Sequence, residues 1–561
     1  MINPGETSSK KQDHIESFRR WFHGISFLIV GTALFLLLQR LFLPKWNHPS
    51  MPENLTYSLE TFFAQENNTD EVIFLGSSHM EYGFSPMQFY DQHGVASYNL
   101  GLSAERLSGA FYLLREALKT QKPKVIVLDA SDLFLEDTAE SQWRYIMDNM
   151  GNIGTKISMA EGYSRFKTGS EEHRVPDALV PLLLYHSRWK NLSETDFRDF
   201  AKKKDYYAAG YFLSTDCIGS GQTLDNMNSV TEMLQEDTVR TQIRYENGQE
   251  IVSEEEDPLY EALISDENIQ WLNKIISLCQ ESGTELLLTK IPSIMYPITY
   301  ESAWTRIRSS AVKQFAEQNG LTFWDILYDT DINIDIDHDF ADGGRHLNYL
   351  GARKVTDYLG AYLVSHYDLE PKENDAFSSS LLLYDQVTQM AMMQLEQDMD
   401  RYLDWLDRYK EDCMIILCVS EDAVNGLGES QRKSLKKLGL SAVFGEAPKS
   451  EEAYLALIDS GKVIYEASSN RQLEYHRQLG PALDVSVIST GRKTGKKASV
   501  LIGGQEYAVN SAGLNIVVYD KKTEEVVDSV VFNTGEDSPY PCKHKDSQTY
   551  INQYGLALYR S

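Results

Sequence analysis

Short runs of aliphatic and β-branched residues alternate with stretches of helical periodicity from residue 71 to residue 365. Such alternation is typical of an α/β domain whose strands form a largely parallel sheet. Leucine and phenylalanine recur at spacings of four, three and four residues from Leu107 to Leu118, which predicts a core-facing helix that begins near Ser103. The expected strands are 72–75, 97–100, 124–129, 285–290 and 321–326, and further helices are expected at 268–281, 301–319 and 349–365.

A second set of strands follows a polar break near residue 371 and a methionine-rich helix that is expected at 381–410. The turn punctuation between these strands favours a small β-sandwich or α+β module. The expected strands of this set are 414–419, 463–466, 485–489, 498–502, 515–519 and 526–531. We therefore divide the chain into a first domain at 55–370 with an insertion at 133–265, a second domain at 381–535 and a C-terminal tail at 536–561.

One apolar segment precedes both domains. Residues 21–39 contain no Asp, Glu, Lys or Arg, and about 20 such residues cross the hydrocarbon core of a bilayer as a helix. A cleaved signal peptide would have a similar pattern, but the usual small-residue cleavage site is missing, so we expect an uncleaved signal anchor at 21–43. Lys and Arg are denser before this helix than after it, which favours a cytoplasmic tail at 1–20 and an extracellular bulk.

Composition and charge exclude several classes of function. The formal net charge of −29 argues against nucleic acid as a partner. The 5 cysteines are irregularly spaced, so they indicate neither a disulfide framework nor a metal site, and they suit a protein of the bacterial cell membrane and envelope. The chain has neither a Walker A motif nor a strand-linked GxGxxG. We therefore expect no cofactor and no metal.

Two segments carry candidate chemistry. The expected strand 72–75 ends in a turn of small residues, which places the hydroxyl of Ser78 at the carboxyl edge of a parallel sheet, where α/β proteins build their sites. Alone, this turn would as readily be a helix cap as a nucleophile. The second segment is a glycine-rich loop that contains Asp342 and His346 just before the last expected helix. A histidine with a nearby carboxylate can remove the proton of a serine hydroxyl.

These segments, in this order, resemble the SGNH/GDSL hydrolase superfamily over residues 55–370, and within it the DltD-like and polysaccharide O-acetyltransferase-associated extracytoplasmic proteins. The similar blocks are 76–78, 98–101, 124–132 and 342–352. The resemblance implies a three-layer, flavodoxin-like domain with a parallel sheet. It implies Ser78 as nucleophile, His346 as base and Asp342 as the carboxylate that orients the base. It further implies that Gly101 and Asn99 contribute to the oxyanion hole.

The chain departs from the pattern of this superfamily in two places. The third block offers Asp129, Ser131 and Asp132 where standard members supply an asparagine to the oxyanion hole. The spacing between the last Asp and His is four residues rather than three, which keeps Asp339 as a reserve acid. His79 directly follows the expected nucleophile and is a candidate substrate contact, with an exposed turn histidine of no catalytic duty as the alternative.

The second domain, 381–535, resembles the interleukin-like EMT inducer domain in the segments 415–423, 499–507, 513–520 and 530–534. That domain also occurs as a sugar-binding stem in a protein-glycan processing enzyme. The resemblance therefore implies glycan binding, by analogy of fold alone. A structural or protein-docking module is the alternative.

The residues and the resemblance together predict extracytoplasmic, serine-dependent acyl transfer or ester hydrolysis of the O-acetyl or D-alanyl type. The expected substrate is a cell-envelope polysaccharide or teichoic-type polymer, and a membrane-bound O-acyltransferase is the expected partner that delivers the acyl group. The alternative is a non-catalytic envelope protein that binds a glycan or a partner through a degenerate SGNH fold. The altered third block and the stretched Asp–His spacing favour this alternative.

Overall fold

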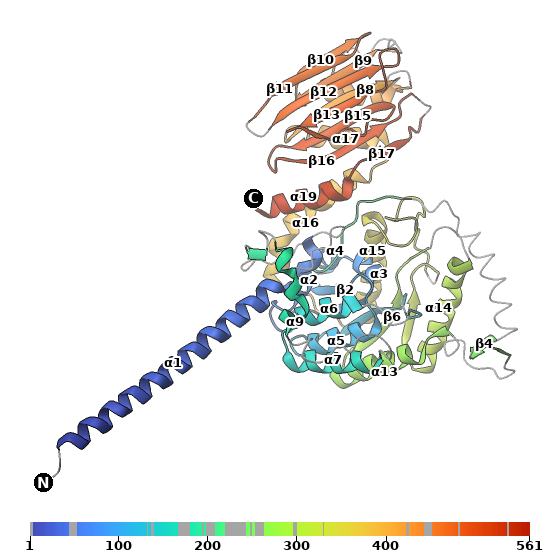
Figure 1. Cartoon of the computed structure of the whole chain (residues 1–561). Coiled ribbons are helices and arrows are strands. Elements are labelled where there is room, and N and C mark those ends of the chain that lie inside the picture. Colours follow the sequence, from blue (N-terminus) through green and yellow to red (C-terminus); the bar gives the residue numbers. More distant parts are fainter. Residues whose placement is uncertain are drawn as a thin grey trace.

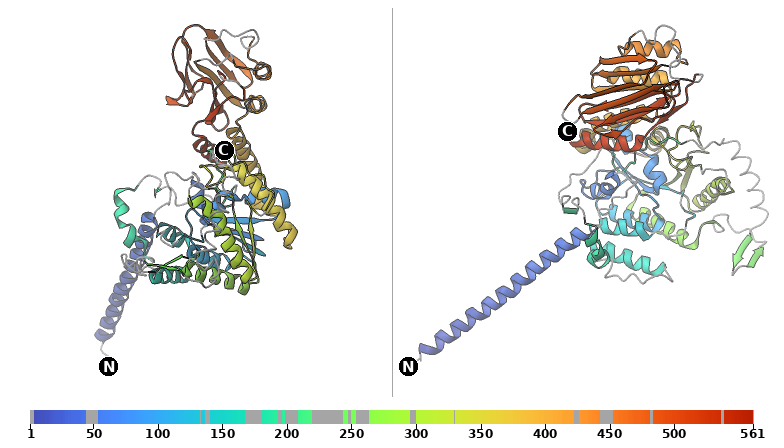
Figure 2. Two further views of the ribbon diagram at one scale, coloured as in Figure 1. Left: turned by 90° about the vertical axis from the view of Figure 1, so that its right-hand side faces the viewer. Right: turned by 45° about the horizontal axis from the view of Figure 1, so that its top comes forward.

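The computed structural model consists of one long projecting helix, an α/β part and a β-rich part (Figure 1). Two further views show that the long helix points away from both other parts, and that helices lie between those two parts (Figure 2). The structure describes residues 4–43, 53–131, 133–135, 140–166, 180–192, 196–197, 208–218, 243–246, 249–252, 263–294, 300–328, 330–421, 426–441, 452–480, 483–535 and 538–560.

Helix α1 (Pro4–Phe42) is the projecting helix. Its stretch Phe18–Phe42 has a mean hydropathy of 2.0, and none of its most apolar window is buried against the rest of the chain. Its C-terminal end is held by Arg188, which donates hydrogen bonds to the carbonyl oxygens of Phe42 at 2.9 Å and Leu43 at 2.8 Å. By length and composition, this helix is able to cross a membrane.

Within the described residues, the sheet of the α/β part has five parallel strands in the order β2-β1-β3-β6-β7. Val72 and Phe74 of β1 lie in one hydrophobic cluster, whereas Ile73 and Leu75 lie in another. Both faces of the sheet are therefore buried, as parallel sheets require. The five predicted strands are confirmed as β1 (Val72–Gly76), β2 (Ser97–Gly101), β3 (Val125–Asp129), β6 (Glu285–Lys290) and β7 (Thr322–Asp325).

Helices cover both faces of this sheet. Helix α15 (Tyr349–His366) packs in the first cluster, and α5 (Leu107–Ala117), α13 (Asp266–Ser282) and α14 (Tyr300–Gln318) pack in the second. All four were predicted, although α5 begins four residues later than expected. The remaining elements of this part are α2 (Glu53–Phe62), α3 (Ser78–Gly83), α4 (Pro86–His93), α6 (Glu140–Asn149), α7 (Ile153–Phe166), α9 (Pro181–Tyr185), the 3-10 helix η1 (His186–Lys190) and the hairpin of β4 (Ile243–Glu246) and β5 (Gln249–Val252).

Much of the predicted insertion, 133–265, lies outside the described residues. Its described segment 208–218, which we call the strap, lies beside the sheet; it begins with a turn and forms neither helix nor strand. The amide of Asn99 on the edge strand β2 donates to the carbonyl of Ala209 at 3.0 Å, and the amide of Phe212 donates to Glu81 of α3 at 2.9 Å. A piece of the insertion is therefore built into the carboxyl edge of the sheet.

The single helix predicted at 381–410 is wrong, because the structure has two helices there. Helix α16 (Asp375–Gln394) ends before a short break, and α17 (Met399–Tyr409) follows it. The second helix starts at an N-cap, since the Asp398 side chain accepts a hydrogen bond from the amide of Arg401 at 3.0 Å. Aspartate at this position satisfies an amide that has no partner within the helix.

The strands of the β-rich part form one ten-stranded mixed sheet, in which the end of β12 pairs in parallel with the end of β8. Ile416 of β8 and Val487 of β12 lie in one hydrophobic cluster, whereas Leu417 of β8 lies in another together with Leu403 of α17. This arrangement agrees with the β-rich α+β module that was predicted. Its strands are β8 (Cys413–Glu421), β9 (Ala453–Asp459), β10 (Lys462–Ser469), β11 (Leu473–Gln478), β12 (Asp484–Gly491), β13 (Ala498–Ile502), β14 (Gln505–Glu506), β15 (Gly513–Asp520), β16 (Glu525–Phe532) and β17 (Cys542–His544), with helix α18 (Glu429–Lys437).

The predicted C-terminal tail contains a helix, α19 (Ser547–Arg560), which lies between the α/β part and the β-rich part (Figure 1). Its first turn is bonded to the strap. The side-chain amide of Gln548 accepts from the amide of Thr215 at 2.8 Å and donates to the carbonyl of Leu213 at 3.0 Å. Helix α19 therefore ties the end of the chain to the α/β part.

Candidate active site

The chain turns sharply between β1 and α3, and this turn presents Ser78. Gly76 has a φ of 146°, and a β-carbon built there would lie 2.7 Å from the β-carbon of Asp129. Glycine is therefore required by both the backbone conformation and the close neighbour. Ser77 caps α3, since its hydroxyl accepts a hydrogen bond from the amide of His79, and Ser78 is the first residue of the helix.

The structure brings Ser78 and His346 together although 268 residues separate them. The hydroxyl oxygen of Ser78 lies 2.7 Å from Nε2 of His346. On the other side of the ring, Nδ1 of His346 lies 2.7 Å from the carboxylate of Asp342, which also accepts from the His346 backbone amide at 2.8 Å. A carboxylate against Nδ1 holds the proton on that nitrogen, so that Nε2 can accept the serine proton.

Electrostatics favour an ionised Asp342. Burial alone would raise its pKa, but the hydrogen bonds and the charge of His346 outweigh burial and hold the pKa of Asp342 below its usual value. The side chain of His346 is 16% exposed and that of Asp342 is 41% exposed, so both can be reached from solvent. The pair therefore combines an imidazole that hydrogen bonds hold on both sides with partial exposure to solvent.

The carboxylate of Asp339, the reserve acid, bonds to groups other than His346. Its carboxylate accepts hydrogen bonds from the ammonium of Lys354 and the amide of Asp335, both at 2.6 Å. Burial raises the pKa of Asp339 despite the ion pair with Lys354. Its contacts serve the loop and α15, so the carboxylate that meets His346 in this structure is that of Asp342.

The aromatic surroundings of His346 come from His79, which was a candidate, and from Tyr82 and Phe212, which the sequence did not single out. The ring of Tyr82 lies 4.8 Å from that of His346 and stacks at 4.3 Å on Phe212 of the strap. The ring of His79 lies 5.3 Å from that of His346, and its Nδ1 lies 3.1 Å from the hydroxyl of Ser77. Tyr82 follows Ser78 by one helical turn, which is a usable signal, but the sequence around Phe212 carries none.

Hydrogen bonds from the strap also hold the loop that carries the acid and the base. The amide of Gly343 donates to the carbonyl of Ile218 at 2.9 Å, and the amide of Ile218 donates to Phe340 at 3.2 Å. The amide of Tyr349, the first residue of α15, donates to Ser214 at 2.8 Å. The position of His346 therefore depends on a segment that lies more than a hundred residues earlier in the chain.

Asn99 and Gly101, which were expected to contribute to the oxyanion hole, bond to groups of the protein in this structure. The side-chain amide of Asn99 donates to the carbonyls of Met80 at 2.8 Å and Phe84 at 2.9 Å, and its oxygen accepts from the amide of Gly101 at 2.9 Å. The side chain of Asn99 thus holds α3 against β2, and the amide of Gly101 is bonded to that side chain. The amide of Ser78 is different, because the first amides of a helix have no partner within it.

The described residues of the third block also make hydrogen bonds within the fold. The carboxylate of Asp129 accepts from the amide of Ile291 at 3.0 Å and from the hydroxyl of Ser131 at 2.9 Å. Asp132 lies outside the described residues. Within the described part of the chain, no three His, Cys, Asp or Glu side chains come together as metal ligands would.

Two buried carboxyl groups, those of Glu81 and Glu105, lie near α3. Burial raises the pKa of Glu81, on α3, to about 8, even though its carboxylate accepts a hydrogen bond from Ser103 at 3.0 Å. Burial, together with the charge of Glu81, also raises the pKa of Glu105 well above its usual value. Burial therefore favours the uncharged form of both carboxyl groups near Ser78.

The fold and this geometry define a class: an α/β protein with a linked serine, histidine and aspartate at the carboxyl edge of a parallel sheet. No family model and no curated protein matches the chain. Similar solved structures include a protein named as an acylhydrolase from Bacteroides fragilis, with 11% identity over 55% of this chain and 94% of the other, at a TM-score of 0.25. Another is a GDSL-like lipase from Bacteroides thetaiotaomicron, with 12% identity over 55% and 94% of the two chains, at a TM-score of 0.23. The function is therefore argued from the geometry of the chain itself.

Proposed function

We propose that the chain is an SGNH-type serine esterase or O-acyltransferase that works outside the cell membrane. The observation that carries the proposal is the continuous chain of hydrogen bonds from Ser78 through His346 to Asp342. Neither distance exceeds 2.7 Å, so the serine, base and acid are already in register for proton transfer.

The reaction then follows from the positions of these groups. Nε2 of His346 takes the proton of Ser78 as its oxygen attacks the acyl carbon, and Asp342 stabilises the imidazolium that forms. The amide of Ser78 faces the developing oxyanion. Collapse of the tetrahedral species breaks the ester bond, His346 returns the proton to the departing alcohol, and the acyl group stays on Ser78.

The second half-reaction repeats these steps with a new hydroxyl. Water as the acceptor gives an esterase, and a sugar hydroxyl gives an acyltransferase. The amide of Gly101 would join the oxyanion hole only after it released the side chain of Asn99. This engagement of Asn99 and Gly101 is the observation that favours the alternative, a non-catalytic envelope protein that binds a glycan or a partner.

The proposed setting is the outer face of a bacterial cell membrane, with α1 as a single-pass anchor and residues 1–20 in the cytoplasm. The exposed apolar surface of α1 supports the anchor, and the basic residues before it support the orientation. The proposed substrate is an O-acetyl or D-alanyl ester of a cell-envelope polysaccharide or teichoic-type polymer, with a membrane-bound O-acyltransferase as the donor-side partner. The sequence resemblance to DltD-like proteins and to the interleukin-like EMT inducer domain supports these choices.

A fluorophosphonate probe and an acetyl ester test the reaction on the full chain in detergent. We expect labelling and ester turnover in the wild type and in Ser277→Ala, whose serine lies exposed on α13. We expect neither in Ser78→Ala or His346→Ala. Equal labelling of Ser78→Ala and the wild type would remove Ser78 as the nucleophile, and a wild type inert to both reagents would support the binding alternative.

A further inference from the structure

A short segment of the insertion is packed against the end of the projecting helix. It consists of α9 and η1, and we call Pro181–Lys190 the α9–η1 segment. It lies beside the point where α1 meets the α/β part (Figure 1). The amide of Leu182 donates to the side chain of Gln39 at 2.8 Å, and the guanidinium of Arg188 donates to the carbonyl of Phe42 at 2.9 Å. The segment is therefore fixed to the last turns of α1.

These contacts lie where α1 would leave a bilayer. The apolar stretch of α1 begins at Phe18, and Gln39 lies about 32 Å further along the helix at about 1.5 Å per residue. The hydrocarbon core of a bilayer is about 30 Å thick. A segment that is bonded to Gln39 and Phe42 is therefore at the level of the lipid head groups when α1 spans the membrane.

The α9–η1 segment exposes large apolar side chains. Leu183 is 53% exposed and Trp189 is 63% exposed, and neither helix of the segment has a buried residue. Tryptophan is enriched at membrane–water interfaces because its ring is mostly apolar and its indole N–H is polar. An exposed tryptophan beside the end of a membrane-spanning helix suits this zone.

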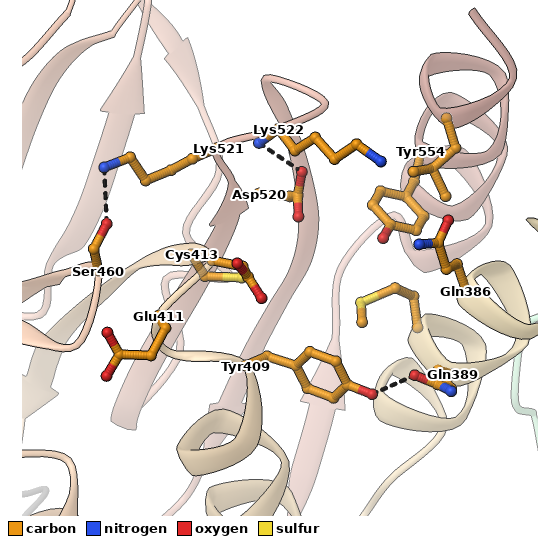
Figure 3. Close-up of a pocket in the computed structure, with 13 residues that line it drawn as sticks. Gln386, Gln389, Tyr409, Glu411, Cys413, Ser460, Asp520, Lys521, Lys522 and Tyr554 are labelled. Atoms are coloured by element: carbon orange, nitrogen blue, oxygen red, sulfur yellow. Dashed lines mark hydrogen bonds between the residues drawn. The ribbon is translucent and has the colours of Figure 1, made fainter. Parts of the chain in front are cut away.

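The charge of the segment is opposite to that of the chain. It contains Arg188 and Lys190 and no Asp or Glu, whereas the whole chain has a formal net charge of −29. A cavity of about 480 Å³ between α16, the start of β8 and α19 is an example of the acidic surface, since its Lys521 is already paired with Asp459 at 2.6 Å (Figure 3). The other charged groups that line this cavity are Glu411, Asp412, Asp520 and Lys522.

The positive charge and the exposed aromatic ring of the segment lie together. The ammonium nitrogen of Lys190 is 5.6 Å from the centre of the Trp189 ring. Helices that lie on a membrane surface combine apolar side chains with Lys and Arg, because anionic head groups attract the basic groups. The α9–η1 segment therefore matches an anionic lipid surface in both shape of exposure and charge.

The inward side of the segment is fixed to the rest of the insertion. The hydroxyl of Tyr185 donates to the carboxylate of Asp148 on α6 at 2.7 Å. Arg188, three residues later, pairs with the buried carboxylate of Asp196 at 2.8 Å. The exposed side chains on the other side thus keep a fixed position relative to both α1 and the α/β part.

We propose that the α9–η1 segment lies in the head-group zone of the bilayer and binds anionic lipid. Leu183 and Trp189 enter the boundary between head groups and acyl chains, and Lys190 bonds to phosphate oxygens. This contact requires that α1 spans the membrane, as proposed, and is independent of the reaction at Ser78. Together, α1 and the segment hold the α/β part in one orientation on the membrane surface.

Quenching of tryptophan fluorescence by brominated lipids tests this contact on the full chain in lipid nanodiscs. The signal of Trp189 is the difference between the wild type and Trp189→Phe, and the signal of Trp21, near the other end of the apolar stretch, is obtained with Trp21→Phe. We expect both signals to be quenched, that of Trp189 more by lipids brominated near the ester group than by lipids brominated near the chain end. Trp405→Phe is the control, since Trp405 stacks on Tyr409 in α17, far from α1, and its signal should not be quenched (Figure 1).

A second measurement tests the preference for anionic lipid. One basic side chain near an anionic surface gives about a fivefold preference for it. At equal mole fraction, brominated phosphatidylglycerol should therefore quench Trp189 more than brominated phosphatidylcholine does. Lys190→Gln should lose most of this difference, whereas Lys433→Gln, at an exposed position of α18, should keep it.

The outcomes separate this contact from the proposed function. Quenching of Trp21 without quenching of Trp189 would overturn the contact and leave the anchor intact. Quenching of neither would remove the anchor and the contact together, while fluorophosphonate labelling of the same samples reports the reaction at Ser78 separately. Equal quenching of Trp189 by the two lipids in the wild type would overturn the binding of anionic lipid.

Discussion

Replacement of Asp342 by asparagine tests the part of the site on which the reaction most depends. Asparagine keeps an oxygen for the backbone amide of His346, so the loop retains its shape, but it removes the charge opposite Nδ1. A hydrogen bond to a charged group contributes about 1.5–3 kcal/mol. Since about 1.4 kcal/mol is a factor of ten in rate, this loss alone predicts a decrease of about 10- to 150-fold in kcat.

The comparison with Asp339→Asn sharpens this prediction. Asp339 is 1% exposed and pairs with Lys354, so its replacement should lower the free energy of unfolding and leave turnover per folded molecule unchanged. Acetyl ester hydrolysis is measured for both variants after titration of active sites with fluorophosphonate, and stability is measured by urea unfolding. Unchanged turnover in Asp342→Asn together with lost turnover in Asp339→Asn would refute the assignment of the acid.

Three other perturbations probe the supports of the site and the fold. Gln548→Leu removes two hydrogen bonds between α19 and the strap. We expect this variant to have a lower kcat at similar KM and a lower Tm. The control Gln553→Leu, at an exposed position of the same helix, should change neither kcat nor Tm. Gly76→Ala should cost about 1–3 kcal/mol from backbone strain alone, so a wild-type urea midpoint would contradict the tight turn. Burial lowers the pKa of His544, but the adjacent carboxylate of Asp528 outweighs it and raises the pKa well above its usual value. A raised pKa stabilises the fold below about pH 6.5 and less as pH rises, so urea unfolding from pH 6 to 9 should show a decline that His544→Gln lacks.

Much of the fold could be predicted because its central strands are buried on both faces. Residues such as Val72 and Ile73 both face a core, so the strand reads as a continuous apolar run that local pattern alone identifies. The break between α16 and α17 gave a weaker signal, since a single N-cap at Asp398 interrupts an otherwise helical composition. Helix α19 was missed because its packing partners lie far away in the sequence.

In the candidate site, too, some features could be predicted from the sequence and others could not. Ser78, Asp342 and His346 were predicted because their chemistry is carried by side chains at turns that glycines mark. Asn99 and Gly101 were expected in the oxyanion hole, but an amide is available to a substrate only if the fold gives it no other partner, and the side chain of Asn99 already accepts from the amide of Gly101. The sequence shows that Asn99 has a side-chain amide that can donate hydrogen bonds. Which acceptors it reaches depends on how α3 packs on β2.

The strap supports the loop of Asp342 and His346, and this support could not be predicted from the sequence. Hydrogen bonds from Ile218 and Ser214 fix the loop and α15, and Phe212 stacks on Tyr82 beside His346. The hydrogen bonds of the strap to this loop and to α15 are made by backbone groups, and only the stacking of Phe212 on Tyr82 needs a particular side chain. The sequence of the strap therefore gives almost no signal of its role. Loss of its hydrogen bonds to Gln548 should nevertheless make the position of His346 less fixed, although Gln548 does not contact His346. The position of His346 therefore depends on contacts with the strap in the insertion and, through the strap, with the last helix α19.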